Sequence, residues 1–234
     1  MRRSYLGATG FPYEPYAYYQ LNGDVLDYSG NNRHALAPNA TPSWFTAGFN
    51  GRQALQGGSY LAGNSGDTFG VRTPWMFDSS WQSFIVVFKV YVTSQANYNN
   101  LFDIHHASVR GCNMQYNTAD SGWAITVTNQ SPPFPAPVGL GFSLPLNQWI
   151  TVTFIRRRSD GLTGVFVDTN LRQQQYVLQD MVFQGSPTYN NSTALLIGGC
   201  AYWGRYLNGR VQDFAIFKGE YTDAQIQDII SFYS

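Results

Sequence analysis

The sequence predicts an all-β fold, a two-sheet antiparallel jelly-roll sandwich with one short C-terminal helix. Aromatic residues make up 16% of the 234 residues, and such side chains favour half-buried pleated surfaces. Lys and Glu, which usually fill exposed helix faces, occur only twice each. Short apolar runs alternate with Gly, Asn and Asp turn signals along the chain, which is typical of sandwiches and jelly rolls.

The strands are predicted from apolar runs and from alternation. The run 84–92 is almost wholly apolar, which indicates a strand with both faces covered. Trp123, Ile125 and Val127 alternate with smaller residues, and the segment 150–154 shows the same period of two. Three further strands are predicted at 165–167, 195–197 and 211–217.

The helix is predicted at the C-terminus. Thr222 is a good N-cap, and Gln225 follows three residues later, which together form a capping box. Apolar residues then recur at helical spacing on one face, namely Ile226, Ile229, Ile230 and Tyr233. We expect this stripe to pack against the sandwich as a structural element.

The chain is predicted to consist of an N-terminal arm, residues 1–16, and a single sandwich domain, residues 17–234. The arm is rich in Gly, Pro and Tyr without any period, so it suits docking onto another surface; a first edge strand or a frayed end is an equal alternative. Cys112 and Cys200 are interpreted as small buried thiols, because two cysteines provide neither a disulfide framework nor paired zinc ligands.

Charge and hydropathy exclude several partners. Fourteen basic and fourteen acidic residues give a formal net charge of zero, which argues against nucleic acid binding. The longest apolar run has nine residues, whereas a bilayer needs about 20, so no membrane span is predicted. No signal peptide is predicted either, because the first residues lack an apolar core of about 7–15 residues. We therefore expect synthesis in the cytoplasm.

Residues 17–23, 27–32 and 49–55 together resemble the opening part of laminin G-like, concanavalin A-like jelly-roll domains. Residues 17–23 and the turn at 27–32, Asp-Tyr-Ser-Gly-Asn-Asn, resemble the first strand of that family and its Asp-x-Ser-Gly-Asn turn. Residues 49–55, Phe-Asn-Gly-Arg-Gln-Ala-Leu, resemble the next element, in which a glycine turn precedes a strand.

The later part continues the same resemblance in order. Residues 147–153 resemble the strand that the family opens with Trp, and 165–168 resemble its Val-Asp hairpin, with Thr169 in place of the usual Gly. Ile-Gly-Gly at 197–199 and the segment 207–217 resemble the closing signature. The resemblance covers about residues 17–230 and implies two curved antiparallel sheets.

The resemblance also implies a structural calcium ion near the joined chain ends, held by Asp27 and Asp213. Calcium prefers carboxylate, carbonyl and water oxygens. Strand alternation would place Asp213 on one face with Ala215 and Phe217, and with Val211 as well. A carboxylate on a buried face needs a partner. The alternative is that Asp27 caps its own turn and that Asp213 pairs with an Arg.

A sugar-binding surface is predicted in the loop between two late strands. Sugars dock on exposed aromatic faces while amides and charged groups contact their hydroxyls, and loops commonly carry such sites. The predicted ligand-binding residues are Tyr202, Trp203, Arg205 and Tyr206. The alternative is that these side chains pack the loop or contact another protein.

Catalysis is not predicted. Glycoside hydrolysis needs two carboxyl groups, and hydrolases that share this resemblance carry a Glu-x-Asp-x-x-Glu strand. The two glutamates here are Glu14 in the arm and Glu220 in the loop before the helix. No catalytic residue is therefore assigned.

The sequence is compatible with three functions. The preferred prediction is a non-catalytic structural protein, most concretely a virion accessory component of the head, tail or fibre, which forms a homo-oligomer or docks on a larger assembly. A surface of aromatics, amides and Arg suits such contacts. The alternative is a lectin-like module with a polysaccharide partner. The third is a glycoside hydrolase or lyase.

Overall fold

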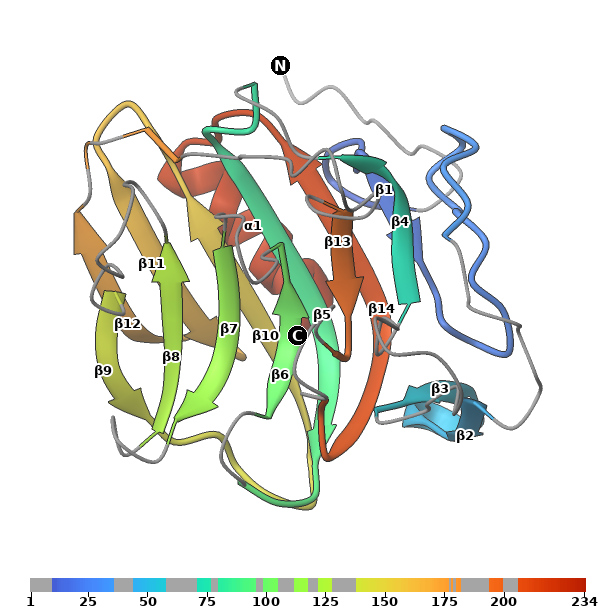
Figure 1. Ribbon diagram of the computed structural model, residues 1–234. Coiled ribbons are helices and arrows are strands. Elements are labelled where there is room, and N and C mark those ends of the chain that lie inside the picture. Colours follow the sequence, from blue (N-terminus) through green and yellow to red (C-terminus); the bar gives the residue numbers. More distant parts are fainter. Residues whose placement is uncertain are drawn as a thin grey trace, which may run out of the picture.

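The computed structural model is a sandwich of two antiparallel sheets with one helix at the C-terminus, as predicted (Figure 1). It describes residues 10–35, 44–57, 71–76, 80–95, 99–104, 112–117, 122–127, 138–176, 178, 180–181, 194–199 and 206–234.

One sheet has eight strands, in the order β12-β11-β10-β5-β14-β3-β2, and β1 also pairs with β14. Its strands are β1 (Ala17–Tyr19), β2 (Phe45–Ala47), β3 (Gln53–Gln56), β5 (Phe84–Val92), β10 (Trp149–Arg156), β11 (Leu162–Val167), β12 (Asn170–Tyr176) and β14 (Gly209–Lys218). A short 3-10 turn, η2 (Phe49–Gly51), joins β2 to β3.

The other sheet has six strands, in the order β4-β13-β6-β7-β8-β9. They are β4 (Val71–Met76), β6 (Asn100–Asp103), β7 (Cys112–Asn117), β8 (Gly122–Val127), β9 (Val138–Phe142) and β13 (Ala194–Ile197). Each strand predicted from the sequence lies within one of these elements.

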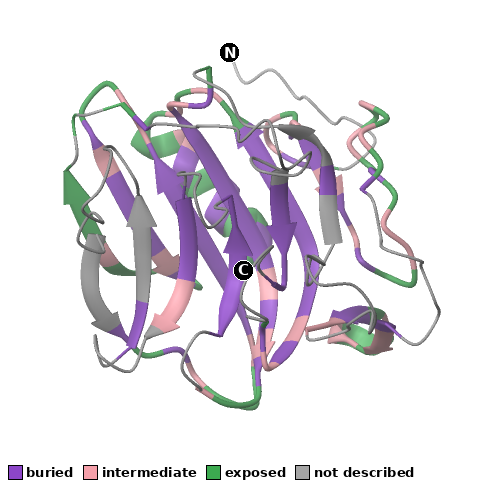
Figure 2. Ribbon diagram, viewed as in Figure 1, coloured by how far each residue is buried: buried purple, intermediate pink, exposed green. Residues whose placement is uncertain are grey.

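The core has two parts, and β5 contributes to both. Phe84, Val86 and Phe88 point between the sheets, where they join the main core. Ile85 and Val87 point to the other face of the eight-stranded sheet and join a second cluster beneath the helix. Figure 2 shows β5 buried along most of its length. The prediction that both faces of this strand are covered is confirmed.

The helix α1 (Asp223–Tyr233) covers the outer face of the eight-stranded sheet. Thr222 caps it, and the predicted capping box with Gln225 is present. The whole predicted stripe is buried against the sheet, namely Ile226, Ile229, Ile230 and Tyr233. The helix is therefore held by tertiary packing rather than by its own propensity.

A β-bulge in β14 makes one sequence prediction wrong. The register of β14 against β5 shifts between Gln212 and Ala215, and Asp213 adopts a φ of 52°. Val211 consequently packs between the sheets, whereas Ala215 and Phe217 face the helix. These residues do not share one face, because a bulge adds a residue to one strand and reverses the alternation beyond it.

The described part of the predicted arm, residues 10–16, packs on the domain itself. Phe11 is 3% exposed, and its ring contacts the rings of Tyr18, Phe217 and Tyr233. The Tyr13 hydroxyl donates to Asp228 of α1 at 2.9 Å. These contacts join the described part of the arm to β1, β14 and α1.

Two smaller predictions concern thiols and membranes. Cys112 is a free, fully buried thiol, and burial raises its pKa. Cys200 lies outside the described residues. Within the described ranges, no helix combines the length and apolar character needed to cross a bilayer.

Candidate functional site

Asp27 organises the opening turn through backbone hydrogen bonds. Its Oδ1 accepts from the N–H groups of Tyr18 and Ser29, both at 2.9 Å, and its Oδ2 accepts from the Arg33 N–H at 2.8 Å. Burial acts to raise the pKa of Asp27, but these hydrogen bonds outweigh it, so the pKa lies below its usual value. Asp27 therefore caps its own turn.

Asp213 pairs with an arginine at the β14 bulge. The Arg52 guanidinium donates to both carboxylate oxygens, at 2.9 and 3.0 Å, and the Tyr18 hydroxyl donates to Oδ1 at 2.8 Å. Burial, followed by the nearby charge of Asp213, raises the pKa of Tyr18. A left-handed backbone is tolerated better by Asp than by most residues.

Tyr18 connects the two predicted metal ligands. Its backbone N–H binds Asp27, while its hydroxyl binds Asp213 at the far end of the side chain. Among the described residues, no group of three or more His, Cys, Asp or Glu side chains could hold a metal ion. Calcium binding stays a prediction, and an ion would compete with these N–H and O–H donors for the carboxylates.

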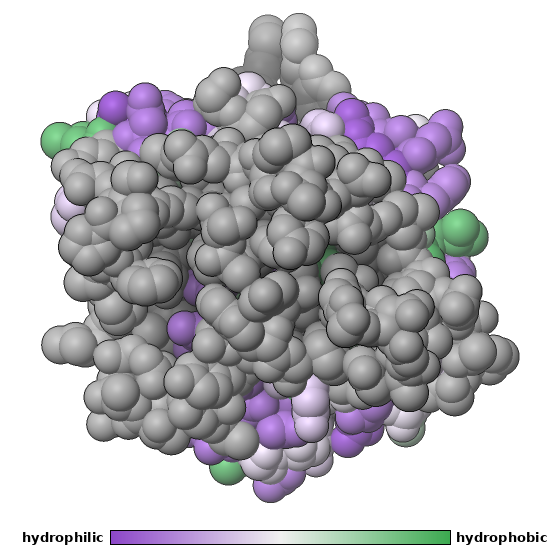
Figure 3. All heavy atoms as spheres, in the orientation of Figure 1, coloured by the Kyte–Doolittle hydropathy of each residue, from purple (hydrophilic) through white to green (hydrophobic). Residues whose placement is uncertain are grey.

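The predicted sugar-binding loop lies mostly outside the described residues. Tyr202, Trp203 and Arg205 are not described, whereas Tyr206 is 41% exposed and forms a bridge with Gly199. In Figure 3 the described side chains at the rim of the molecule are mainly hydrophilic, with isolated apolar ones among them. The loop stays a prediction.

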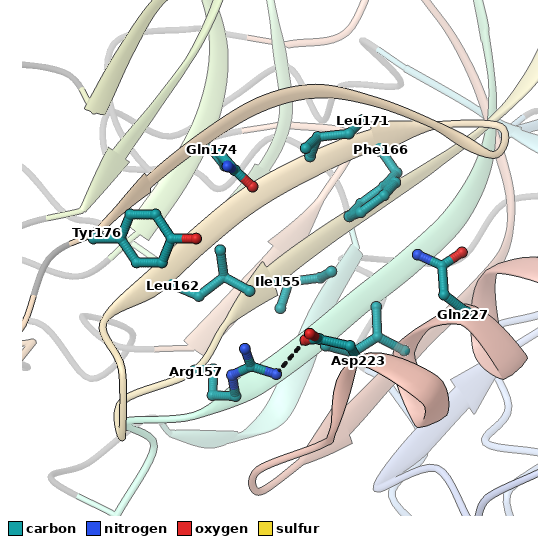
Figure 4. A pocket seen from close by; sticks show the side chains of 10 residues that line it. Ile155, Arg157, Leu162, Phe166, Leu171, Gln174, Tyr176, Asp223 and Gln227 are labelled. Atoms are coloured by element: carbon teal, nitrogen blue, oxygen red, sulfur yellow. Dashed lines mark hydrogen bonds and ion pairs between the residues drawn. The ribbon is translucent and has the colours of Figure 1, made fainter.

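A groove lies on the outer face of the eight-stranded sheet, between α1 and the β11–β12 hairpin (Figure 4). Its volume is about 330 Å³. It combines apolar residues from the sheet with polar residues from β12 and the first turns of α1. The lining residues are Ile155, Arg157, Leu162, Phe166, Leu171, Gln174, Tyr176, Asp223, Ile226 and Gln227.

The shape of the groove follows from the edge position of β12. Among the described strands β12 pairs only with β11, and most of its residues are exposed. Its register shifts opposite Val165 and Phe166, which adds one residue to β12. Leu171 therefore lines the groove together with Gln174 and Tyr176, although simple alternation would separate them.

Most polar side chains along the groove form no hydrogen bond with other described residues. The side chains of Gln174, Gln227 and Tyr176 make no hydrogen bond to another described residue, and Tyr176 is 62% exposed. The Asp223 side chain is 83% exposed, and only its Oδ1 has a partner among the described residues. Two amides, a phenol and a carboxylate oxygen thus line an apolar floor.

Arg157 closes one end of the groove and is already paired. Its NH1 donates to Asp223 Oδ1 at 2.6 Å and to the Tyr221 carbonyl at 3.1 Å. Its Nε and NH2 donate to Asp160, the latter at 2.6 Å. The hydrogen bond to Asp160 is the largest cause of a raised Arg157 pKa. A second depression of about 400 Å³ lies beyond Arg157 and is bordered by Asp160 and Glu220.

This arrangement suits a ligand rich in hydroxyl groups. An aromatic face and an apolar floor can cover the C–H surface of a sugar ring, while amides and a carboxylate bind its hydroxyls. Asp223 is the only carboxylate among the described lining residues, whereas glycoside hydrolysis generally uses two. The groove therefore offers groups suited to binding hydroxyls.

Sequence reasoning missed this groove. The run Gln-Gln-Gln-Tyr at 173–176 was available as a signal, because amides beside an aromatic ring are groups that can bind a sugar. Asp223 and Gln227 carry no such signal, since they join the groove only when the helix packs on the sheet.

Comparison with known families places the fold. A laminin G family model, described as the concanavalin A-like lectin/glucanases superfamily, matches residues 76–227. A search of curated proteins finds no significant match.

Several solved structures share the fold. Domain 4 of the arabinanase AbnA from Geobacillus stearothermophilus, in complex with arabinotriose, has a TM-score of 0.63 at 17% identity and covers 93% of this chain and 98% of its own. The binding domain of botulinum neurotoxin DC, in complex with SialylT, has a TM-score of 0.63 at 15% identity, covering 94% of this chain and 51% of its own. Trypanosoma rangeli sialidase, in complex with sialic acid, has a TM-score of 0.55 at 15% identity, covering 92% and 32%. The chain thus spans about half of the neurotoxin domain.

Proposed function

The chain belongs to the concanavalin A-like lectin/glucanase superfamily, and from this premise we propose that it is a carbohydrate-binding domain that holds a saccharide in the α1–β12 groove without cleaving it. The observation that carries the proposal is a set of polar side chains that have no partner among the described residues and surround an apolar floor. Gln174 and Gln227 face the groove from opposite walls, and Tyr176 adds an exposed ring (Figure 4).

The similar structures support the ligand class in general terms. The arabinanase domain was solved with arabinotriose and the sialidase with sialic acid. At these low identities the likeness shows only the fold, so the position of the ligand is argued from the groove of this chain. The absence of catalysis is proposed because the described lining residues include one carboxylate.

The test measures saccharide binding by calorimetry for the wild type and three tyrosine variants. We expect Tyr176→Ala to weaken binding at least tenfold, since the ring supplies much of the contact area. Tyr206→Ala tests the predicted loop, and Tyr28→Ala, exposed at another place, is the control. Loss of binding in Tyr206→Ala alone would move the site to the loop. A wild type that binds no saccharide would overturn the proposal.

The role in virion assembly stays a prediction beside this proposal. Leu171, Tyr176 and Leu178 are 45%, 62% and 60% exposed, which also suits contact with another protein. Sedimentation of the purified chain tests it. A ring, a trimer or association with a particle would support assembly, whereas a monomer without partners would count against it.

A further inference from the structure

We propose that the α1–β12 groove selects neutral saccharides and discriminates against acidic ones, because its arginine is already paired with carboxylates of the protein. This inference rests on the proposed function and concerns the ligand class of the same groove. It follows from the contacts of Arg157, from the charges around Arg157, and from the lining groups that have no partner in the described part of the chain.

Arg157 has little capacity left for a ligand anion. Its NH1 donates to Asp223 and to the Tyr221 carbonyl, and its Nε and NH2 donate to Asp160. A guanidinium has five N–H donors in a fixed plane, and these contacts direct at least four of them to the protein. A carboxylate on a sugar would have to displace Asp160 or Asp223 before it could bind Arg157.

The charges near Arg157 make such a displacement unfavourable. Asp160 and Asp223 are its ion-pair partners, and Glu220 borders the adjoining depression. One cation and three carboxylates give a local charge of +1 − 3 = −2. The hydrogen bond from Arg157 lowers the pKa of Asp160, so Asp160 is ionised at neutral pH. An anionic ligand therefore meets a surplus of negative charge.

The remaining groups match neutral hydroxyls. Asp223 Oδ2 has no partner among the described residues and can accept from a hydroxyl. Gln174 and Gln227 each carry a donor and an acceptor, so each can donate a hydrogen bond to a hydroxyl or accept one from it. Tyr176 can stack on the ring itself. Replacing a sugar hydroxyl by a carboxylate removes a donor that Asp223 could use.

The experiment compares neutral and acidic trisaccharides on the intact chain. Arabinotriose and maltotriose are the neutral probes, and trigalacturonate and sialyllactose are the acidic ones. Of the two neutral probes, we expect the one with the higher affinity to bind at least tenfold more strongly than either acidic probe at low salt. Because charge repulsion is screened by salt, the ratio should narrow as salt is added.

Two matched variants assign the selection to the groove. Asp223→Asn removes the negative charge that faces the ligand, and we expect the neutral-to-acidic affinity ratio to fall severalfold. Asp228→Asn removes the same charge from an exposed position on the same helix that does not line the groove. We expect this control to leave the ratio unchanged.

The outcomes separate this inference from the proposed function. If neutral and acidic probes bind equally, or acidic ones bind more tightly, the selection is wrong while saccharide binding stands. If Asp223→Asn and Asp228→Asn change the ratio to the same extent, the groove carboxylate does not select, and the inference fails. If no saccharide binds at all, both proposals fail together.

Discussion

Asp213 and Asp223 are carboxylates in neighbouring elements, one at the β14 bulge and the other at the start of α1, yet their surroundings are opposite. Asp213 is 7% exposed, and both of its oxygens are bound by Arg52, with Tyr18 as a further donor. The Asp223 side chain is 83% exposed, and a single oxygen is bound by Arg157.

This contrast distinguishes polar groups that stabilise the fold from polar groups that could still bind a ligand. A buried carboxylate must be satisfied by the protein, because an unsatisfied one costs several kcal/mol. An exposed carboxylate can leave an oxygen to water or to a ligand at little cost. The bulge and the opening turn therefore hold the fold, whereas the proposed binding groove carries polar groups that have no partner among the described residues.

The largest effect is expected from Asp213→Ala. The change leaves the Arg52 charge and the Tyr18 hydroxyl without their partner and places Ala at a left-handed φ of 52°. We expect the free energy of unfolding to fall by about 3 kcal/mol, as measured by urea denaturation. Asp213→Asn keeps an acceptor and tolerates the backbone, so it should lose less. Equal losses for the two variants would mean that the stability comes from the ion pair, and that the left-handed backbone at this position contributes little.

The next effect is expected from Asp27→Ala and its dependence on pH. Three backbone N–H groups lose their acceptor, so we expect a loss of about 2 kcal/mol at pH 7. The pKa of Asp27 is lowered in the folded state, so its contribution is present above the unfolded value of about 3.9 and is lost as the pH falls through the lowered value.

Denaturation from pH 7 to pH 2 checks this dependence. The stability difference between the wild type and Asp27→Asn should shrink at the acid end, because both side chains are then uncharged. A difference that stays constant over the whole range would show that the charge of Asp27 does not contribute.

A small effect on stability is expected in the groove. Gln174→Ala and Gln227→Ala remove side chains without partners among the described residues, so each should change the free energy of unfolding by less than about 0.5 kcal/mol. Both should weaken saccharide binding severalfold in calorimetry. A large loss of stability would show that these amides stabilise the fold as Asp213 does. That result would contradict the distinction between the groove and the β14 bulge.

No change is expected on chelation. The sequence predicts calcium at Asp27 and Asp213, but the protein supplies N–H and O–H donors to these oxygens, so we expect the Tm in EDTA to equal that in calcium. A bound ion would stabilise the folded state and raise the Tm with its concentration. A drop of several degrees in EDTA would confirm the calcium prediction.

Local sequence determined the elements. Alternation and the apolar run at 84–92 predicted β5 with its two covered faces, and the capping box predicted the start of α1 at Thr222. These features act over a few residues, because side chains repeat every two positions in a strand and every 3.6 in a helix. The order of the motifs also led to the family, which the match over residues 76–227 shows.

Tertiary structure decided the faces and the site. One added residue at the β14 bulge moved Ala215 and Phe217 to the helix side, which no alternation rule shows in advance. Gln174 and Gln227 meet at one groove only because α1 packs beside the edge hairpin. The scarcity of Lys and Glu indicated a surface of amides and aromatics, but which of those groups the protein itself satisfies depends on contacts between segments far apart in the chain.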